Sequence, residues 1–121
     1  MECIFCKIIK GEIPSYTIYE NEHVKCFLDI NPNSVSHTLV VPKTHIKDAL
    51  EMDNETIVHI NNALKEVVHK IDTIFNPDGY KFTVNYGICQ DVKHYHLHII
   101  PKYKKDPNVQ NIEEVYKKLI N

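Results

Sequence analysis

The residues with the clearest chemical potential lie within positions 91–101, where His94, His96 and His98 stand at alternate positions. Successive side chains of a β-strand point to opposite faces, so these imidazoles would share one face, and the tyrosine, leucine and isoleucine that follow them would share the other. Helical residues two apart do not share a face, and the β-branched and aromatic neighbours before Pro101 favour a strand. The segment is therefore predicted to present one chemical face and one core face.

A face that carries three imidazoles suits either a metal ion or a phosphoryl group. Two histidines from one strand, completed by a third histidine or a carboxylate, can form an open metal site. A neutral imidazole is also a nucleophile for phosphorus, and its neighbours can fix its tautomer and neutralise phosphate charge. Crowded imidazoles lower one another's basicity, which keeps an attacking ring neutral near pH 7. The alternative is a polar strand face with solvated histidines, which alternating identical side chains between core residues make less favoured.

A second candidate site is the Cys-x-x-Cys pair formed by Cys3 and Cys6. Such a pair is half of a tetrahedral zinc site and is also the form of a redox dithiol. The redox interpretation needs a strand before the pair, and only two residues precede Cys3. Zinc is therefore favoured, and two ordinary buried thiols remain the alternative.

Length and composition indicate the broad class of protein. The 121 residues are enough for one domain with a real core and too few for two, so residues 1–121 are expected to form a single domain. A net charge of −2 gives no case for a nucleic-acid partner. The first residues lack the basic segment followed by an apolar segment that is typical of a secretory signal, and no apolar run is long enough to span a membrane. We therefore expect a cytoplasmic protein with no membrane partner, in which four cysteines indicate thiols or a metal site.

Periodicity and turn residues predict the elements of the first half of the chain. A short helix is expected over residues 5–9, and short strands over residues 15–19 and 23–28. An apolar strand over residues 37–42 begins with a histidine. Thr44 is expected to cap a short helix that reaches about residue 51.

The longest helix is expected to begin at Asp53 or Asn54. Its apolar positions repeat every three or four residues and are assigned to the core. These positions are Ile57, Ile60, Leu64, Val67, Val68, Ile71 and Ile74. His59 and His69 lie outside this stripe and are interpreted as solvated side chains.

The last part of the chain is expected to form a strand over residues 80–85, a loop over 86–90 and then the histidine strand, as an antiparallel pair. That loop can offer backbone N–H groups to a phosphate. A final helix begins at Asn111, with an apolar side made of Ile112, Val115, Leu119 and Ile120. Asp29 follows the second strand, where it can either cap its own turn or accept hydrogen bonds from ribose hydroxyls.

The run His94-Tyr-His-Leu-His-Ile-Ile100 resembles the histidine triad (HIT) family, whose pattern is His-x-His-x-His followed by two apolar residues. The stretch that ends in Pro42-Lys-Thr-His45 also recurs there, and the resemblance extends along nearly the whole chain. It implies an α+β, HIT-like fold with a mainly antiparallel five-stranded sheet, one long helix and short terminal helices. It also implies a homodimer.

The resemblance further implies a hydrolase that binds a purine nucleotide similar to AMP. His96 would attack the α-phosphorus and form a nucleotidyl-histidine that water then cleaves. His98 and His37 would orient His96 and bind phosphate oxygens, and Asp29 would hold the ribose. The other positions implied for nucleotide binding are Phe5, Ile8, Phe27, Ile30, Asn85, Asp91 and Val92.

The Cys-x-x-Cys pair resembles a zinc-bearing branch of the same family. In that branch the implied ligand set is Cys3, Cys6, His45 and His94, a closed Cys2His2 site with a structural zinc ion. The ion would connect the N-terminus to the catalytic strand and support the neighbouring His96. A metal ion held by the three triad histidines is the competing hypothesis.

One departure from the family pattern concerns the leaving group. Many members have Gln-Ser-Val or Gln-Thr-Val before the triad, whereas this chain has Gln90-Asp-Val92, and an ionised aspartate cannot donate a proton. The leading hypothesis is hydrolysis of a nucleoside phosphoramidate or a related ester. The alternatives are a dinucleoside polyphosphate hydrolase, a nucleotidyl transferase and a non-catalytic nucleotide-binding or interaction module.

Overall fold

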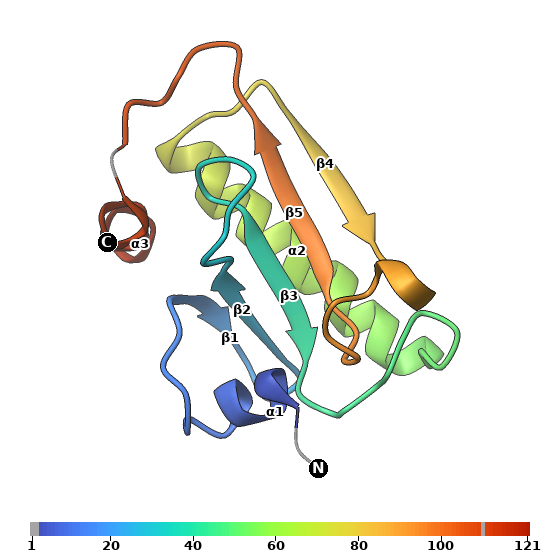
Figure 1. Cartoon of the computed structure of the whole chain (residues 1–121). Helices are drawn as coiled ribbons and strands as arrows, with labels where there is room; N and C mark the ends of the chain where they lie inside the picture. Colours follow the sequence, from blue (N-terminus) through green and yellow to red (C-terminus); the bar gives the residue numbers. More distant parts are fainter. Residues whose placement is uncertain (1–2, 110) are drawn as a thin grey trace.

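The computed structural model describes residues 3–109 and 111–121 (Figure 1). Met1 and Glu2, which belong to the expectation about a leader, lie outside this part. Its centre is a five-stranded sheet in the order β1-β2-β3-β5-β4, and every neighbouring pair is antiparallel. The strands are β1 (Thr17–Glu20), β2 (Val24–Leu28), β3 (Thr38–Pro42), β4 (Gly79–Val84) and β5 (Leu97–Lys102). This architecture confirms the expected α+β fold.

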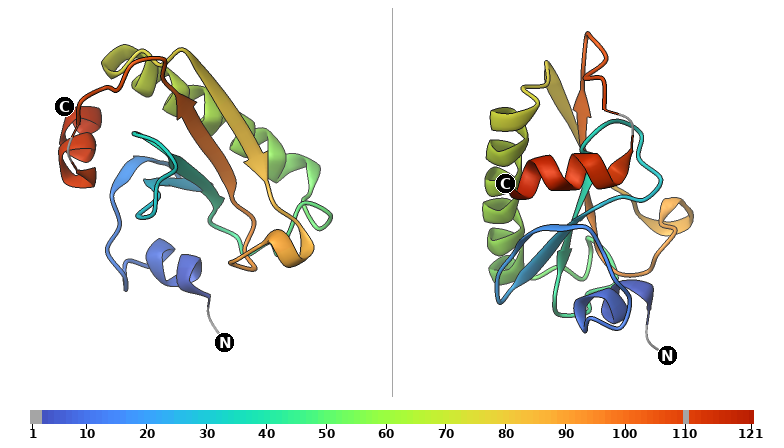
Figure 2. Two further views of the ribbon diagram at one scale, coloured as in Figure 1. Left: turned by 45° about the horizontal axis from the view of Figure 1, so that its top comes forward. Right: turned by 90° about the vertical axis from the view of Figure 1, so that its left-hand side faces the viewer.

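Three α-helices and one 3₁₀ turn surround the sheet. They are α1 (Ile4–Ile9), α2 (Asn54–Ile74), α3 (Ile112–Ile120) and η1 (Gly87–Cys89). Helix α2 covers one face of the sheet, while α1 and η1 lie on the opposite side, as the right-hand view of Figure 2 shows. Among the described residues, no helix is long and apolar enough to cross a membrane. The face opposite α2 is therefore the one left for a site.

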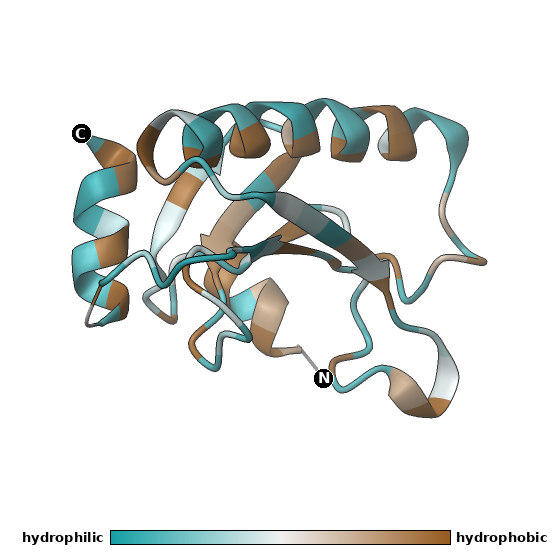
Figure 3. Cartoon of the chain, turned by 90° about the horizontal axis from the view of Figure 1, so that it is seen from above, coloured by the Kyte–Doolittle hydropathy of each residue, from teal (hydrophilic) through white to brown (hydrophobic). Residues whose placement is uncertain are grey.

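Helix α2 packs the apolar stripe predicted from its periodicity against the sheet (Figure 3). Ile60, Val67 and Ile71 are buried, but Ile57 and Ile74 are 38% and 42% exposed, so their assignment to the core is wrong. A helix of 21 residues is about 32 Å long, whereas strands of four to six residues reach only about 13–20 Å. The first and last turns therefore extend beyond the sheet.

Side-chain caps fix where the helices begin. The Asp53 carboxylate accepts a hydrogen bond from the Thr56 N–H at 2.6 Å, and Asn111 accepts one from the Glu114 N–H at 2.9 Å. Both helix starts agree with the sequence prediction. Ile120 lies on the exposed side of its helix, unlike the rest of the predicted apolar side.

The short helix predicted after Thr44 does not form, and residues 43–51 are bends and turns. Distant residues bind the carbonyls that such a helix would need. Tyr95 N–H donates to the Ile46 carbonyl at 2.7 Å, and the Gln90 side chain donates to the Lys47 carbonyl at 2.7 Å. Tertiary hydrogen bonds thus override the local helical pattern.

His69 is exposed as expected, whereas His59 is half-buried. The rings of His59 and His23 stack with centroids 3.5 Å apart and an interplanar angle of 10°. This contact joins α2 to the turn before β2, and it could not be predicted from the helical pattern alone.

Candidate functional site

The histidine segment is only partly a strand. Strand β5 begins at Leu97, so His94 and His96 precede it, because the Tyr95 N–H binds Ile46 on a distant loop instead of a neighbouring strand. The alternation of faces nevertheless holds. Tyr95, Leu97 and Ile99 are buried in the core beneath α2, while His96 and His98 line a cavity on the opposite side.

That cavity has a volume of about 550 Å³ and lies between α1, the end of β2 and the histidine segment. Its lining includes most of the residues implied for nucleotide binding: Phe5, Ile8, Phe27, Asp29, Ile30, Asp91 and Val92. Asn85, which the resemblance also implies for nucleotide binding, is not among the described residues that line the cavity. The cavity is large enough for a nucleoside monophosphate and has a mainly apolar wall.

The sequence analysis missed several lining residues, including Leu39 and the loop residues Ile13 and Tyr16. Leu39, on β3, is two positions after His37, which directly precedes that strand, and it pairs with His98 on β5. Alternation of faces along this segment could therefore have identified it. The loop before β1 carries no comparable periodic signal. Its place beside the cavity follows from tertiary packing.

His96 is held from two sides, by a backbone carbonyl and by an aromatic ring. Its Nδ1 lies 2.8 Å from the His94 carbonyl, and a carbonyl only accepts, so Nδ1 carries the proton and Nε2 keeps its lone pair. The Phe5 ring of α1 packs edge-on against the imidazole with centroids 5.0 Å apart. His96 is 6% exposed and lines the cavity. A nucleophilic nitrogen is thus fixed in one tautomer.

A single backbone N–H determines the tautomers of the other two histidines. Asn33 N–H donates to His37 Nδ1 at 3.0 Å, so the proton of His37 is on Nε2. His37 Nε2 lies 3.0 Å from His98 Nδ1, so Nδ1 of His98 accepts this hydrogen bond. The proton of His98 is therefore on its Nε2. That buried N–H has no hydrogen-bond partner in the described part of the chain. It is an available donor for an anionic ligand.

Burial keeps the imidazoles of His98 and His37 neutral. Burial, reinforced by His96 and His37, lowers the pKa of His98 to about 4. Burial also lowers the pKa of His37, against the opposing effect of Asp29, whose Oδ2 lies 3.6 Å from His37 Nε2. Neutral imidazoles at pH 7 preserve the tautomers inferred from the hydrogen bonds.

Asp29 performs the turn-capping role that the sequence left open. Its Oδ1 accepts a hydrogen bond from the Asn31 N–H at 2.9 Å. The side chain also lines the cavity, where Oδ2 faces His37. Turn capping occupies only one carboxylate oxygen, so it leaves the other for a ligand.

The four residues implied as metal ligands form one cluster, with their ligand atoms within 4.8 Å of one another: Cys3, Cys6, His45 and His94. The cysteine sulfurs are 3.3 Å apart, and the two histidine Nδ1 atoms are 3.1 Å apart. A tetrahedral zinc ion with bonds of about 2.0–2.3 Å places its ligand atoms roughly 3.3–3.8 Å apart. The observed spacing is close to this geometry.

The orientation of His94 supports the same interpretation. Its Nε2 lies 2.8 Å from the Pro42 carbonyl, so Nε2 carries the proton and the Nδ1 lone pair points to the cysteines. His94 is fully buried. Two thiols and two imidazoles are the donor set of a closed zinc site, so the residues fit this ion.

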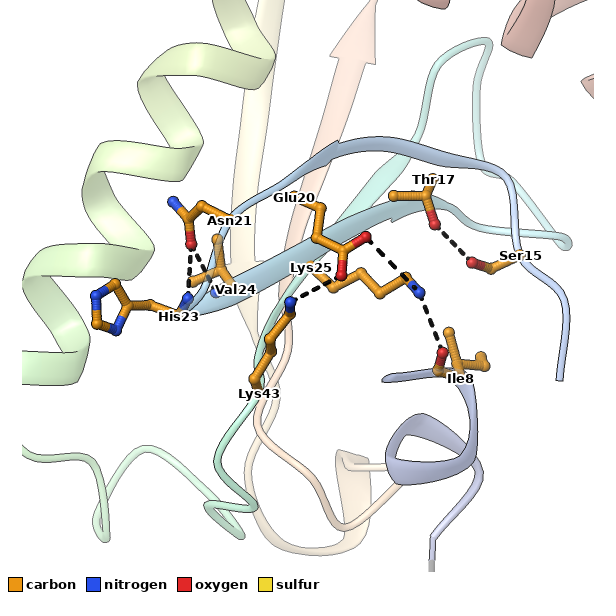
Figure 4. Close-up of polar contacts among 9 residues, drawn as sticks. All are labelled: Ile8, Ser15, Thr17, Glu20, Asn21, His23, Val24, Lys25 and Lys43. Carbon is orange, nitrogen blue, oxygen red and sulfur yellow. Dashed lines mark hydrogen bonds and ion pairs between the residues drawn. The ribbon is translucent and has the colours of Figure 1, made fainter. Parts of the chain in front are cut away.

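Helix α1 carries Cys6 of this cluster and Phe5 of the cavity, and its C-terminal end is tied to the sheet (Figure 4). The Lys25 ammonium, from β2, donates to the Ile8 carbonyl at 3.1 Å. Glu20 lies 4.0 Å from Lys25 and 2.8 Å from Lys43, and the Lys43 bond lowers the pKa of Glu20. The cluster of Cys3, Cys6, His45 and His94 and the Lys25 side chain therefore hold opposite ends of α1.

The fold and the site together define a class of α+β proteins in which imidazoles meet at an apolar cavity beside a Cys2His2 cluster. The chain matches the HIT domain over residues 10–105, and it belongs to this family. A zinc-bound histidine triad family protein from Mycobacterium smegmatis has a TM-score of 0.88 at 32% identity, with 99% of this chain and 91% of that chain covered.

Two relatives have names that describe an activity. The adenosine 5′-monophosphoramidase of Schizosaccharomyces pombe is 41% identical over 104 residues, which are 84% of this chain and 75% of that protein. The adenylylsulfatase of Arabidopsis thaliana is 34% identical over 107 residues, which are 87% of this chain and 54% of that protein.

Proposed function

We propose that this chain is a purine nucleotide-binding hydrolase that cleaves nucleoside phosphoramidates or related esters at the α-phosphate through a nucleotidyl-His96 intermediate. The observation that carries the proposal is the pair of imidazole nitrogens at the cavity. His96 Nε2 has a lone pair, and His98 Nε2 has a proton without a partner. A nucleophile and a donor for a phosphoryl oxygen therefore stand side by side.

The cavity suggests how an AMP-like substrate would be placed. The nucleobase would lie between the apolar side chains of Phe5, Ile8 and Phe27, which offer little to distinguish one purine from another. Asp29 Oδ2 would accept hydrogen bonds from the ribose. The α-phosphate would then reach His96 and His98.

In the first step, His96 Nε2 forms a bond to phosphorus while the bond between phosphorus and the leaving nitrogen breaks. The electron pair goes to that nitrogen, which takes two protons from solvent and leaves as an ammonium ion. The imidazole of the adduct is a cation whose Nδ1–H still binds the His94 carbonyl. His98 Nε2–H donates to a phosphoryl oxygen, and His37 holds His98 in the required tautomer.

In the second step, water attacks the same phosphorus and the bond from Nε2 to phosphorus breaks. His96 returns to its neutral form, the nucleoside monophosphate leaves, and two protons go back to solvent. The relatives named as a monophosphoramidase and an adenylylsulfatase support adenylyl compounds as substrates. A dinucleoside polyphosphate hydrolase or a nucleotidyl transferase would share the covalent step.

We also propose that Cys3, Cys6, His45 and His94 hold a structural zinc ion. The ion would supply a cross-link, with no open position for substrate. His94 would then be fixed by the metal at Nδ1 and by Pro42 at Nε2, and its carbonyl orients His96. The zinc-bound relative supports this assignment.

Trapping the intermediate tests the proposal. Wild-type protein is mixed with adenosine 5′-phosphoramidate, quenched without acid and analysed by mass spectrometry, and the adenylyl adduct is expected on His96. His96→Ala should lose turnover by several orders of magnitude while it keeps affinity for AMP. Undiminished turnover in His96→Ala would contradict the enzyme proposal, and an unreactive wild type that binds AMP would favour the non-catalytic module.

We further propose a cytoplasmic homodimer of single-domain chains. Strand β4 is an edge of the sheet, and Phe82 and Val84 on it are 48% and 38% exposed. An exposed edge with apolar side chains favours pairing with a second copy. Light scattering should report twice the mass of one chain for wild type and the monomer for Phe82→Lys.

A further inference from the structure

The cavity differs in charge from an ordinary phosphate-binding site. Its charged side chains are two carboxylates, Asp29 and Asp91, and no lysine or arginine lines it within the described residues. Sites for polyphosphates usually supply arginine, lysine or a metal ion to balance the negative charge. This cavity therefore suits a substrate with one negative charge at phosphorus better than a polyanion.

The two carboxylates occupy different positions. Asp29 lies at the end of β2, where one oxygen caps a turn and the other faces His37. Asp91 and Val92 precede the histidine segment and line the cavity together with His96 and His98. Asp91 is exposed and accepts no hydrogen bond from the described part of the chain, and nearby Lys93 donates to the Gly87 carbonyl. The Asp91 carboxylate thus has no hydrogen-bond partner within the described residues and lines the same cavity as the two imidazoles.

We propose that Asp91 is a specificity-determining residue that selects leaving groups which depart as ammonium ions over leaving groups which depart as anions. This inference rests on the proposed function. As the bond between phosphorus and nitrogen breaks, the leaving nitrogen gains protons and positive charge, which a carboxylate stabilises. Sulfate and phosphate leave with negative charge, which the same carboxylate repels. Phosphoramidates of amines are therefore the favoured substrate class.

Two other properties of the site agree with this role. Burial lowers the pKa of His98, and Asp91 partly opposes this effect, so the carboxylate acts electrostatically on an imidazole of the cavity. A carboxylate without a proton cannot act as the donor that a serine or threonine hydroxyl could be at this position. Its effect on the leaving group is thus electrostatic.

The test compares wild type with Asp91→Asn and Asp91→Ser on two substrates, hexylamine adenosine 5′-phosphoramidate and adenylyl sulfate. The measured quantity is the ratio of variant to wild-type kcat/KM for each substrate, which cancels their different intrinsic reactivities. Asp91→Asn is expected to lower kcat/KM for the phosphoramidate about tenfold and to leave that for adenylyl sulfate equal or higher. Glu66→Gln, on the exposed side of α2, removes an equal charge and should change neither value.

Equal fold-changes on both substrates in the two Asp91 variants would overturn the inference while the proposed function stands. A wild type that hydrolyses neither substrate would overturn both. The affinity for AMP and the melting temperature are measured in parallel. Because Asp91 is exposed and forms no internal hydrogen bond, the melting temperature is expected to match wild type, and the affinity for AMP is expected to stay equal or rise as a negative charge is removed. A phosphoramidate defect that only followed a loss of folded protein would also count against the inference.

Discussion

The tautomer of His98 depends on one hydrogen bond that involves no residue of the His-x-His-x-His motif. The Asn33 N–H donates to His37 Nδ1, and the effect passes through His37 Nε2 to His98. A backbone N–H cannot reverse its role, so this chain of donors has only one direction. A second proton on His98 would break it, which agrees with the lowered pKa of that ring.

This arrangement makes a prediction about pH. The pKa of His98 is about 4 in the folded chain and 6.5 as the ordinary value. Between these values the unfolded chain binds a proton that the folded chain does not, so the free energy of unfolding falls as pH drops from about 6.5 to about 4. Above pH 6.5 this contribution is fully present.

An NMR titration of ring ¹⁵N shifts in the folded protein measures the pKa directly, with exposed His69 as the internal control. We expect His98 to stay neutral, with its proton on Nε2, down to about pH 5. His98→Gln should flatten the pH dependence of the melting temperature relative to wild type. A His98 midpoint near 6.5, or a proton found on Nδ1, would contradict the inferred tautomers.

At the level of secondary-structure elements, α1 is the part of the site with the least support of its own. A helix of six residues is too short to be stable alone, so its position depends on its attachments. Lys25→Met removes the donor to the Ile8 carbonyl and should cost about 1.5–3 kcal/mol of stability, the range for a charged donor. Since α1 contributes Phe5 and Ile8 to the cavity, KM should rise more than kcat falls.

The matched control is Lys43→Met, which removes the other lysine bound to Glu20 and leaves the contact to α1 (Figure 4). Steady-state kinetics and thermal unfolding of the two variants separate the roles. If both lysines had equal effects on KM, the contact to α1 would not be what positions the cavity wall. Metal content should be unchanged in either variant.

Elements with a strong local pattern were the ones that the sequence predicted well. Helix α2 combines a capping residue, predicted as Asp53 or Asn54 and found to be Asp53, with a regular apolar stripe. The segment after Thr44 has a comparable local signal, yet bonds from Tyr95 and Gln90 hold it as turns. The motif identified the histidines, whereas the donor from Asn33 and the cavity residue Leu39 depend on packing between segments distant in sequence.

Across the whole molecule, the Cys2His2 cluster joins parts of the chain that are far apart in sequence: the N-terminal segment, the loop after β3 and the segment before β5. Cys3 and His94 are separated by 91 positions, and their ligand atoms lie 3.3 Å apart. The sheet itself depends on α2 and the larger core, which lie on its other face. Loss of the metal should therefore loosen α1 and His94 and leave the sheet folded.

Removing the proposed zinc ion tests this division of the molecule. Cys6→Ala should abolish stoichiometric zinc and lower the melting temperature by about 10 °C, because a structural ion contributes several kcal/mol to folding. The far-ultraviolet circular dichroism should stay near wild type, while KM rises because Phe5 and His96 lose their support. Cys89→Ala, at an exposed thiol outside the cluster, is the control. Zinc retained in Cys6→Ala and lost in His98→Gln would instead place the ion on the triad.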